Sequence, residues 1–221
     1  MSAPANRPLV RAERTRAAIL AAAEHRFARL GYALTRLEDV AEAVGVKRAA
    51  LFYYYRDKQA LYDTVVGDAF GMLVARLDEA FSVEGSIATR IERAVEAWVD
   101  AIVARPTLAR LILRHASEAG ESPTQSLFPE AERLMQTGWT LFEEGRANGE
   151  LAPLHDDPFH TASALIGATV FYVSALAALR PPGDFDPLAP LEVAAHKRDA
   201  LRTARHLFGI RDGERPNEKK C

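Results

Sequence analysis

One short segment of the sequence brings together side chains suited to contact a polyanion. Lys47 and Arg48 can each donate hydrogen bonds to the O6 and N7 atoms of guanine or to phosphate oxygens. Ala49 and Ala50 follow them, and these small side chains would let a helix approach base edges closely. Three consecutive tyrosines at 53–55 cannot all be buried, because neighbours on a helix point about 100° apart. At least one phenol must therefore face solvent, where its hydroxyl can donate to a phosphate.

A helix-turn-helix is the element expected to position these side chains. Residues 35–38 read Thr-Arg-Leu-Glu, a capping box in which the Thr35 hydroxyl and the Glu38 carboxylate accept from free backbone N–H groups. Gly45 can adopt the positive φ that ends a helix, and Val46 begins a second short helix. The second helix of such a motif lies in the major groove of DNA. The inward face of the first helix is predicted to hold Leu37, Val40, Ala41 and Val44.

Charge is distributed unevenly along the chain of 221 residues. Residues 1–60 hold eleven Lys and Arg against six Asp and Glu, a net charge of +5, and the other 161 residues carry −7. A basic segment attached to an acidic remainder favours a polyanionic partner for that segment alone. The alternative interpretation is a chance cluster of solvated charges beside an aromatic patch packed on the surface.

The pattern of these residues resembles the tetracycline-repressor (TetR) family of bacterial regulators, over about residues 11–62. It consists of a long first helix ending in Gly31-Tyr32, the Thr35 cap, Asp39-Val40-Ala41, Gly45-Val46, Leu51 followed by aromatic residues, and Lys58 at the start of the fourth helix. The resemblance implies an all-α fold. An N-terminal three-helix domain with the helix-turn-helix would bind DNA, and a C-terminal helical domain would bind a ligand and dimerise.

Carried over position by position, the resemblance also implies where side chains meet DNA. Thr35 and Arg36 would contact backbone phosphates. Lys47, Arg48, Ala49 and Ala50 would face the bases, and Tyr53, Tyr54 and Lys58 would contact flanking phosphates, Lys58 together with the positive N-terminus of its helix. Three positions depart from the family pattern: Phe52 lacks the usual tyrosine hydroxyl, Arg36 replaces a small hydroxyl residue, and Ala49 replaces a glycine. The operator sequence therefore does not follow from the resemblance.

Proline and glycine residues divide the whole chain into helices, and no segment favours a strand. Apolar residues at helical spacing predict helices over 11–30, 58–81, 87–105, 107–119, 126–148, 158–179 and 190–208. A hydrophobic fraction of 48% with 26% charged residues excludes a wholly disordered chain. The expected organisation is a flexible arm over 1–10, a helix-turn-helix domain over 11–57, a helical ligand-binding and dimerisation domain over 58–210, and a flexible tail over 211–221.

The sequence predicts neither secretion nor membrane insertion. Residues 1–10 contain two prolines and no apolar run of the ~7–15 residues that a signal peptide needs. Residues 161–179 carry no charge, but their alanines and hydroxyl side chains favour a buried or interface helix over a membrane span. The single cysteine, Cys221, excludes a disulfide within these residues and suits a reducing cytoplasm, where we expect the protein to act.

The resemblance implies that the last two long helices of each subunit pair into a four-helix dimer interface. Residues 161–179 support this independently, because alanines, serines and Gly167 permit close approach of helices while larger apolar residues supply contact area. The apolar residues concerned are Leu165, Phe171, Leu176 and Leu179, with Val193, Leu201, Leu207 and Phe208 from the last helix. The alternative is a purely intramolecular core.

A cavity for a small, largely hydrophobic effector is expected among the helices over 87–119 and 126–148. Its candidate lining residues are Trp98, Ile102, Leu111, His115, Met135, Trp139, Phe142 and Phe171. His115 is the expected polar contact, with Arg114 or Glu118 as secondary ones. The alternative is that His115 and the aromatic residues are ordinary core side chains. The net negative charge of this part of the chain disfavours a polyanionic ligand.

Neither a catalytic site nor a bound metal or cofactor is expected. His155, Asp156, Asp157 and His160 could suggest a metal site, but they precede a helix, where aspartate is a common cap. Glu192 and His196 are four residues apart, whereas a di-iron bundle needs Glu-x-x-His on two helices and two further glutamates. The sequence also lacks a glycine-rich phosphate loop and a nucleophile elbow.

The sequence therefore predicts a homodimeric transcriptional regulator without catalytic activity. We expect a repressor that leaves a palindromic double-stranded DNA operator when its effector binds. The alternatives are an activator or a regulator that responds to a protein, and, from a different class, a helical-bundle enzyme with an attached basic face.

Overall fold

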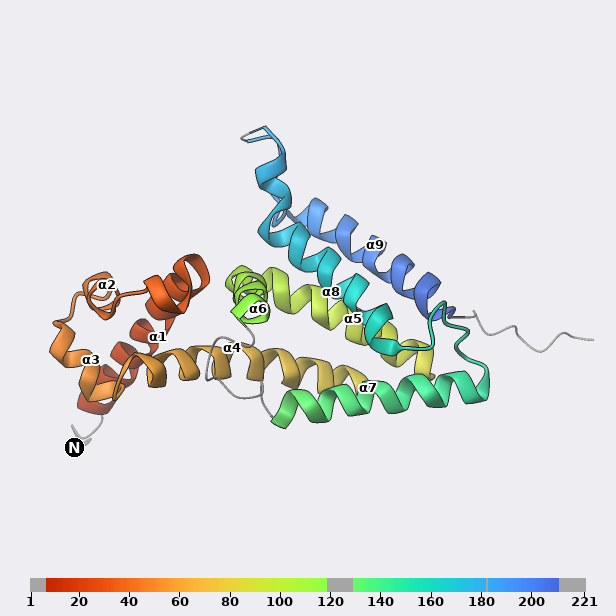
Figure 1. The fold of residues 1–221 in the computed structure, drawn as a ribbon, viewed down its shortest axis with the longest axis horizontal. Helices are drawn as coiled ribbons and strands as arrows, with labels where there is room; N and C mark the ends of the chain where they lie inside the picture. The colour runs from red at the N-terminus through yellow and green to blue at the C-terminus, as the bar shows by residue number, and fades with distance from the viewer. Residues whose placement is uncertain (1–6, 119–128, 182, 211–221) are drawn as a thin grey trace, which may run out of the picture. The chain divides into compact units, whose positions relative to one another are not determined.

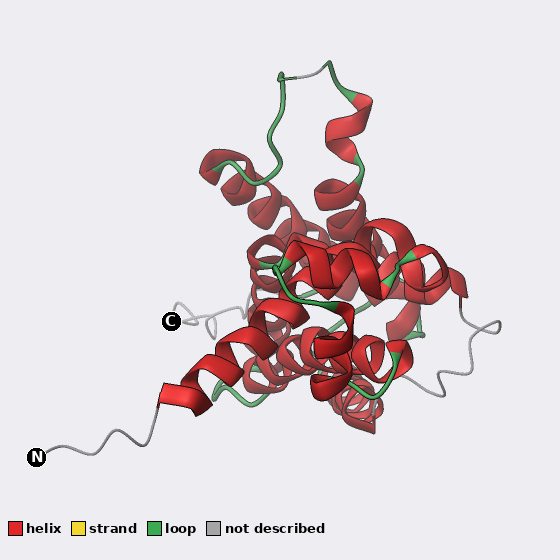
Figure 2. Cartoon of the chain, turned by 90° about the vertical axis from the view of Figure 1, so that its left-hand side faces the viewer, coloured by secondary structure: helices red, strands yellow, loops and turns green. Residues whose placement is uncertain are grey.

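The computed structural model describes residues 7–118, 129–181 and 183–210. Within these ranges the regular structure is helical and contains no strand, which confirms the all-α prediction. Figure 2 shows the described helices joined by loops. A single isolated bridge in the described part pairs Leu151 with Ile210. The chain divides into two compact units.

The first unit holds the N-terminal helices (Figure 1). It contains α1 (Arg7–Leu34), α2 (Leu37–Ala43), α3 (Arg48–Tyr54), the first part of α4 (Lys58–Phe81) and the last part of α6 (Pro106–Glu118). The division falls after Phe70 within α4 and before Arg110 within α6. The expected domain boundary between residues 57 and 58 coincides instead with the beginning of α4.

One side of α1 forms the centre of the first unit. Ile19, Ala23 and Phe27 recur at helical spacing and are fully buried. The rings of Phe27 and Tyr32 each meet the Tyr62 ring edge-on, at centroid distances of 4.9 and 5.1 Å. The other helices add the buried side chains of Val40, Leu51, Leu61 and Val65. The helix-turn-helix is therefore fixed to α1 and α4 by a common apolar core.

Two glycines direct the chain between these helices. Gly31 has a φ of 78° and a ψ of 175°, so the regular part of α1 stops there, as the sequence predicted. Gly45 has a φ of 69° in the turn between α2 and α3. This left-handed conformation favours glycine because it has no Cβ atom. Both helices of the predicted helix-turn-helix and its glycine turn are confirmed.

The arm predicted over 1–10 is described only in part: α1 begins at Arg7, whereas residues 1–6 and the tail predicted over 211–221 lie outside the described residues. The predicted capping box is wrong, because Arg36 is the N-cap of α2 and no side chain caps that helix. Thr35 is 2% exposed, and its hydroxyl donates to the Gly31 carbonyl oxygen at 2.7 Å. A threonine hydroxyl can bond backwards to the residue four positions earlier as readily as it can cap a helix.

The second unit contains α5 (Ile87–Ala104), α7 (Pro129–Asn148), α8 (Pro158–Ser174) and α9 (Pro190–Phe208), with the end of α4 and the beginning of α6. The central helix is α5, which contacts α7, α8 and α9. Its fully buried residues include Val99 and Ile102, which pack in a core that also holds Phe142 and Ala204. Ion pairs link α9 to α5, from Lys197 to Asp100 at 2.5 Å and from Arg205 to Glu92 at 2.7 Å.

The helix predicted over 158–179 is shorter in the structure. Asp157 caps its N-terminus by accepting from the Phe159 N–H, and Pro158 occupies its first turn. The helix ends at Ser174, after which Leu176–Leu179 form a separate 3-10 turn, η1. Apolar periodicity does not distinguish a continuous helix from an α-helix followed by such a turn. Among the helices that the structure describes, none is long and apolar enough to cross a lipid bilayer.

Candidate functional site

The outer face of α3 presents the side chains that the sequence assigns to base contacts. Lys47, Arg48 and Ala49 are exposed and Ala50 is half-buried. Leu51 is buried and anchors the opposite face of this short helix in the core of the first unit. The burial of one apolar face thus leaves the basic residues and the small alanines directed to solvent.

The three consecutive tyrosines occupy three different environments, and they are not all buried, as the helical geometry predicted. Tyr53 is 83% exposed, Tyr54 is half-buried and Tyr55 is 6% exposed. The rings of Tyr53 and Tyr54 meet edge-on with centroids 5.2 Å apart. Tyr53 and Tyr54 are therefore the two phenols of this run that can reach a partner outside the chain.

Arg48 has two neighbours that the sequence analysis did not assign to it. Its Nη1 atom lies 2.7 Å from Oε1 of Glu38, on α2. Its guanidinium also lies over the ring of Phe52, 5.7 Å from the centroid. The four-residue spacing of Arg48 and Phe52 could have indicated the second contact. The first joins two helices, and no feature of the sequence alone pointed to it.

The Lys58 ammonium group, predicted to contact a phosphate, already has partners within the chain. Its Nζ donates to the Ala33 carbonyl oxygen at 3.2 Å and lies 4.5 Å from the centroid of the Tyr32 ring. Partial burial lowers the pKa of Lys58 below its ordinary value. The N-terminus of α4, expected to assist Lys58, is capped by Asp57, whose carboxylate accepts from the Ala60 N–H at 2.8 Å. This hydrogen bond is the largest cause that lowers the Asp57 pKa.

The two other predicted phosphate contacts differ in exposure. Arg36 is exposed at the N-cap of α2. Thr35 is buried with its hydroxyl committed to Gly31, so in this structure it supports the bend between α1 and α2. The phosphate contact of Thr35 stays a prediction, and its exposure does not favour it.

The candidate effector residues belong to both units. Leu111 and His115 lie in the first unit, where the His115 ring is 6.3 Å from the ring of Phe70. Arg114, a secondary candidate, donates from Nε to the Ala28 carbonyl and from Nη2 to the Arg29 carbonyl, at 3.1 and 2.6 Å. Its guanidinium therefore caps the C-terminal end of α1. The side chain of Glu118, the other secondary candidate, lies outside the described residues.

The other six candidates are divided between the core and the surface of the second unit. Ile102, Phe142 and Trp98 are buried, whereas Met135, Trp139 and Phe171 are exposed. The Phe142 ring lies 6.1 Å from that of Phe208, and the exposed Trp139 ring lies 5.8 Å from that of Phe159. Three of these six side chains therefore face solvent, and a common cavity lined by all of them stays a prediction.

Three buried polar atoms in the second unit have no hydrogen-bond partner among the described residues. They are Nε1 of Trp98 on α5, and Oγ1 of Thr161 and the Tyr172 hydroxyl on α8. The two helices pack against each other. Buried polar groups are usually satisfied, because an unpaired one costs about 1–3 kcal/mol. The Trp98 indole N–H and the Thr161 hydroxyl are two such groups on the facing helices α5 and α8.

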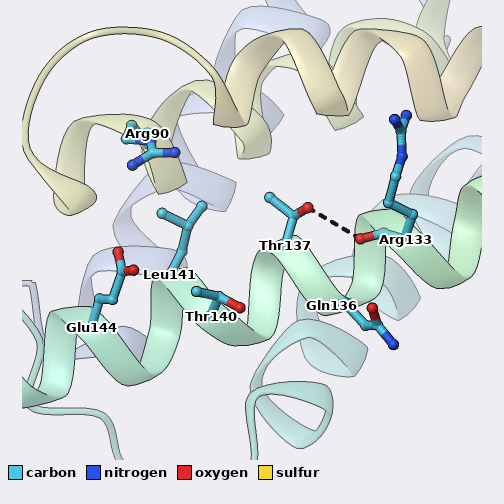
Figure 3. Close-up of a pocket in the computed structure, with 7 residues that line it drawn as sticks. All are labelled: Arg90, Arg133, Gln136, Thr137, Thr140, Leu141 and Glu144. Carbon is cyan, nitrogen blue, oxygen red and sulfur yellow. Dashed lines mark hydrogen bonds between the residues drawn. The ribbon is translucent and has the colours of Figure 1, made fainter.

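An open hollow of about 430 Å³ lies between α5 and α7 in the second unit (Figure 3). It is lined by Arg90, Arg133, Gln136, Thr137, Thr140, Leu141 and Glu144. Nε of Arg90 donates to the Phe81 carbonyl, and Nη2 of Arg133 lies 3.4 Å from Asp78. None of the eight candidate effector residues lines it. Its two guanidinium groups and one carboxylate make it unsuited to a hydrophobic ligand.

The residues that could have suggested a metal site have other roles. Asp157 caps α8, and Asp156 accepts from Arg146 at 2.7 Å. The rings of His155 and His160 lie beside each other, 4.1 Å apart at their centroids. Across the described ranges, no group of three or more His, Cys, Asp or Glu side chains is arranged to hold a metal ion.

Known proteins resemble the chain in both sequence and fold. The sequence pattern of the bacterial regulatory proteins of the tetR family matches residues 19–65. The HTH-type transcriptional regulator RutR of Escherichia coli K12 is 27% identical over 184 residues, which cover 83% of this chain and 81% of RutR.

Two solved structures share the arrangement of helices. The ketosteroid transcriptional regulator KstR2 of Mycobacterium tuberculosis aligns with a TM-score of 0.65 at 19% identity, over 88% of this chain and 94% of KstR2. The transcriptional regulator FadR from Bacillus subtilis, solved in complex with stearoyl-CoA, aligns with a TM-score of 0.58 at 15% identity, over 88% and 99%. With the helix-turn-helix in place and its outer face exposed, these matches show that residues 19–65 carry the sequence pattern of the tetR family of bacterial regulatory proteins, and that the described helices share the fold of TetR-family structures.

Proposed function

We propose that the protein is a homodimeric repressor that binds a pseudo-palindromic DNA operator and leaves it when a largely hydrophobic small molecule binds. The observation that carries this proposal is the outer face of α3, where basic, small and phenolic side chains are exposed together. A transcriptional regulator of this kind acts on DNA in the bacterial cytoplasm.

DNA recognition is assigned to α3 and its surroundings. Lys47, Arg48, Ala49 and Ala50 would face the bases, and Arg36, Tyr53, Tyr54 and Lys58 would contact phosphates. Arginine and lysine recognise guanine through O6 and N7, and the small alanine side chains let the helix approach the base edges closely. Lys58 would have to exchange its bond to the Ala33 carbonyl for a phosphate. Thr35 would contribute to DNA binding indirectly, because its hydrogen bond stabilises the bend between α1 and α2.

Dimerisation is assigned to the exposed apolar face of α8 and the adjoining end of α9. Phe159, Ile166 and Phe171 recur along α8 and are exposed. No atom would lie within 4 Å of a Cβ built on Gly167, so the backbone is open to a second helix there. Leu191, at the start of α9, is 85% exposed. Several large apolar side chains exposed on neighbouring helices are typical of a protein interface.

Ligand binding is assigned to the interior of the second unit. Trp98 and Thr161 supply an unpaired donor and an unpaired hydroxyl among apolar neighbours, which suits an apolar molecule with a few polar groups. The name of one relative in fold supports the same class, since it is a ketosteroid regulator, and another was solved with stearoyl-CoA, of which the stearoyl chain is apolar. Such a ligand would favour a dimer conformation in which the two α3 helices no longer match the groove spacing.

The test is selection of bound duplexes from a random DNA pool with the purified wild-type protein. The proposal expects an enriched sequence with two inverted half-sites and one dimer bound per site. Hydrophobic small molecules are then screened for release of the selected duplex. By linkage, DNA must weaken the binding of any such molecule by the same factor by which the molecule weakens DNA binding. Absence of any enriched sequence would contradict the proposal.

A further inference from the structure

The guanidinium of Arg48 is held from two directions on the outer face of the helix-turn-helix. A carboxylate oxygen of Glu38 lies 2.7 Å from Nη1, and the ring of Phe52 lies beneath the guanidinium carbon at 5.7 Å. Both partners are themselves exposed: Phe52 is 44% exposed. The arrangement thus belongs to the surface that the proposed function brings to DNA.

Stability of the fold gives little reason for this arrangement. An ion pair between exposed side chains contributes little to folding, because water and salt screen it. A negative charge in the first turn of α2 is favourable to the helix, but Asp39 supplies one at the next position. Beside a DNA backbone, a carboxylate is repelled by the phosphates, so Glu38 weakens any contact that depends on charge alone.

The arrangement has a clear consequence for base recognition. Arginine recognises guanine through two parallel N–H donors of one rigid plane, so discrimination depends on how that plane is oriented. Glu38 engages the Nη1 side, and Phe52 restricts the tilt of the plane. The donors on Nε and Nη2 remain to form a bidentate contact. A guanidinium so restrained loses less conformational freedom on binding a base and swings less readily to a phosphate.

We propose that Glu38 and Phe52 are positioning residues for sequence recognition. They orient the Arg48 guanidinium for a bidentate contact with a guanine and keep it from contacting the neighbouring phosphates. This inference rests on the proposed operator binding. It assigns a role in specificity to an acidic residue at the edge of a DNA-binding face, and to the phenylalanine that replaces the family's usual tyrosine. Glu38 lowers the affinity of the protein for DNA of any sequence and raises its preference for the operator.

The experiment compares Glu38→Gln with Glu42→Gln, a matched control. Glu42 is exposed one turn later on the same helix, whereas the Arg48 guanidinium pairs with Glu38. Both variants remove one negative charge, so both should bind a scrambled duplex more tightly than the wild type. Only Glu38→Gln is expected to lower the ratio of operator affinity to scrambled-duplex affinity, by about two- to fivefold for each subunit. Equal ratios in the two variants would overturn the proposal.

A second comparison tests whether Glu38 acts through Arg48. In an Arg48→Ala background, Glu38→Gln is expected to leave the affinity ratio unchanged. A loss as large as in the wild-type background would overturn the assignment to Arg48. Phe52→Tyr should keep the ratio, because the ring remains, and Phe52→Leu should lower it. Circular dichroism of each variant shows whether it is folded before its ratio is used.

These outcomes are distinct from failure of the proposed function. If the wild type binds the selected and the scrambled duplex equally at every salt concentration, operator recognition itself is wrong. If the wild type discriminates strongly while Glu38→Gln and Glu42→Gln behave alike, operator recognition stands and only the positioning role of Glu38 is refuted.

Discussion

The two units of the protein carry their functional residues in different ways. At the start of α3 the residues assigned to the bases are consecutive, exposed or half-buried, and fixed by one buried neighbour, Leu51. In the second unit the residues assigned to the effector come from α5, α7 and α8, and they are divided between core and surface. A site built on one short helix can be recognised from residue types in order. A site built across several helices depends on packing that sequence order does not contain.

The largest expected effect concerns α3. Arg48→Ala should cost about 1–3 kcal/mol of binding free energy at one base position of each half-site, because a bidentate base contact is lost. Lys58→Ala should weaken all duplexes alike and reduce the salt slope by about 1, because a phosphate contact carries no sequence information. Fluorescence anisotropy with single-base operator variants measures both. Loss of specificity to the same extent in the two variants would refute this division of roles.

The second prediction concerns the exposed face of α8. Gly167→Leu should dissociate the dimer, since overpacking of a close contact typically costs about 1–3 kcal/mol. The folded subunit should tolerate it, because nothing lies within 4 Å of the new Cβ. Gly71→Leu on α4 is the matched control, as its Cβ also meets nothing within 4 Å. Light scattering should report a monomer for Gly167→Leu alone. A wild-type monomer at micromolar concentration would exclude the interface.

The third prediction compares two buried threonines, one in each unit. Thr35 is hydrogen-bonded to the Gly31 carbonyl, whereas the hydroxyl of Thr161 has no partner among the described residues. Thr35→Val should lower the free energy of unfolding by about 1 kcal/mol, and Thr161→Val should raise it by a similar amount. Urea denaturation measures both changes. Destabilisation by Thr161→Val would mean that its hydroxyl is satisfied, which would remove one support for ligand binding there.

The smallest expected effect concerns pH. The His196 ring stacks on Tyr172 at a centroid distance of 3.9 Å, and burial lowers the pKa of His196 below 6.5, against an opposing effect of Asp199. The folded state therefore binds the proton less readily than the unfolded state. The stability contributed by neutral His196 is complete above pH 6.5 and is lost as pH falls through the lowered pKa. His196→Phe should flatten the unfolding free energy between pH 7 and 5, and an unchanged pH profile would contradict this.

Much of the fold followed from the sequence because its signals were local. Gly31 and Gly45 ended helices as expected, and the run of tyrosines separated into exposed, half-buried and buried side chains. The errors arose where one local pattern permits two structures. Thr35 bonded backwards to Gly31 where a cap was predicted, and the helix over 158–179 gave way to a 3-10 turn after Ser174.

In the candidate sites, too, features that depend on local sequence could be predicted, and features that depend on helix packing could not. The exposure of Lys47, Arg48 and Tyr53 could be predicted from a single helix. The contact of Glu38 with Arg48 could not, because it depends on the angle between α2 and α3. The burial of Phe142 and the exposure of Trp139 could not be separated either, since both lie on apolar positions of α7 and only the packing of neighbouring helices distinguishes them.

The measurement that tests the central claim most directly is the affinity of wild type and Arg48→Ala for a selected operator and a scrambled duplex, over a range of salt concentrations. We predict that the wild type prefers the operator at every salt concentration. Arg48→Ala should lose most of that preference at one symmetric pair of base positions while it still binds DNA in general. A wild type that does not distinguish the two duplexes, or an Arg48→Ala variant with undiminished preference, would contradict the assignment of sequence recognition to α3.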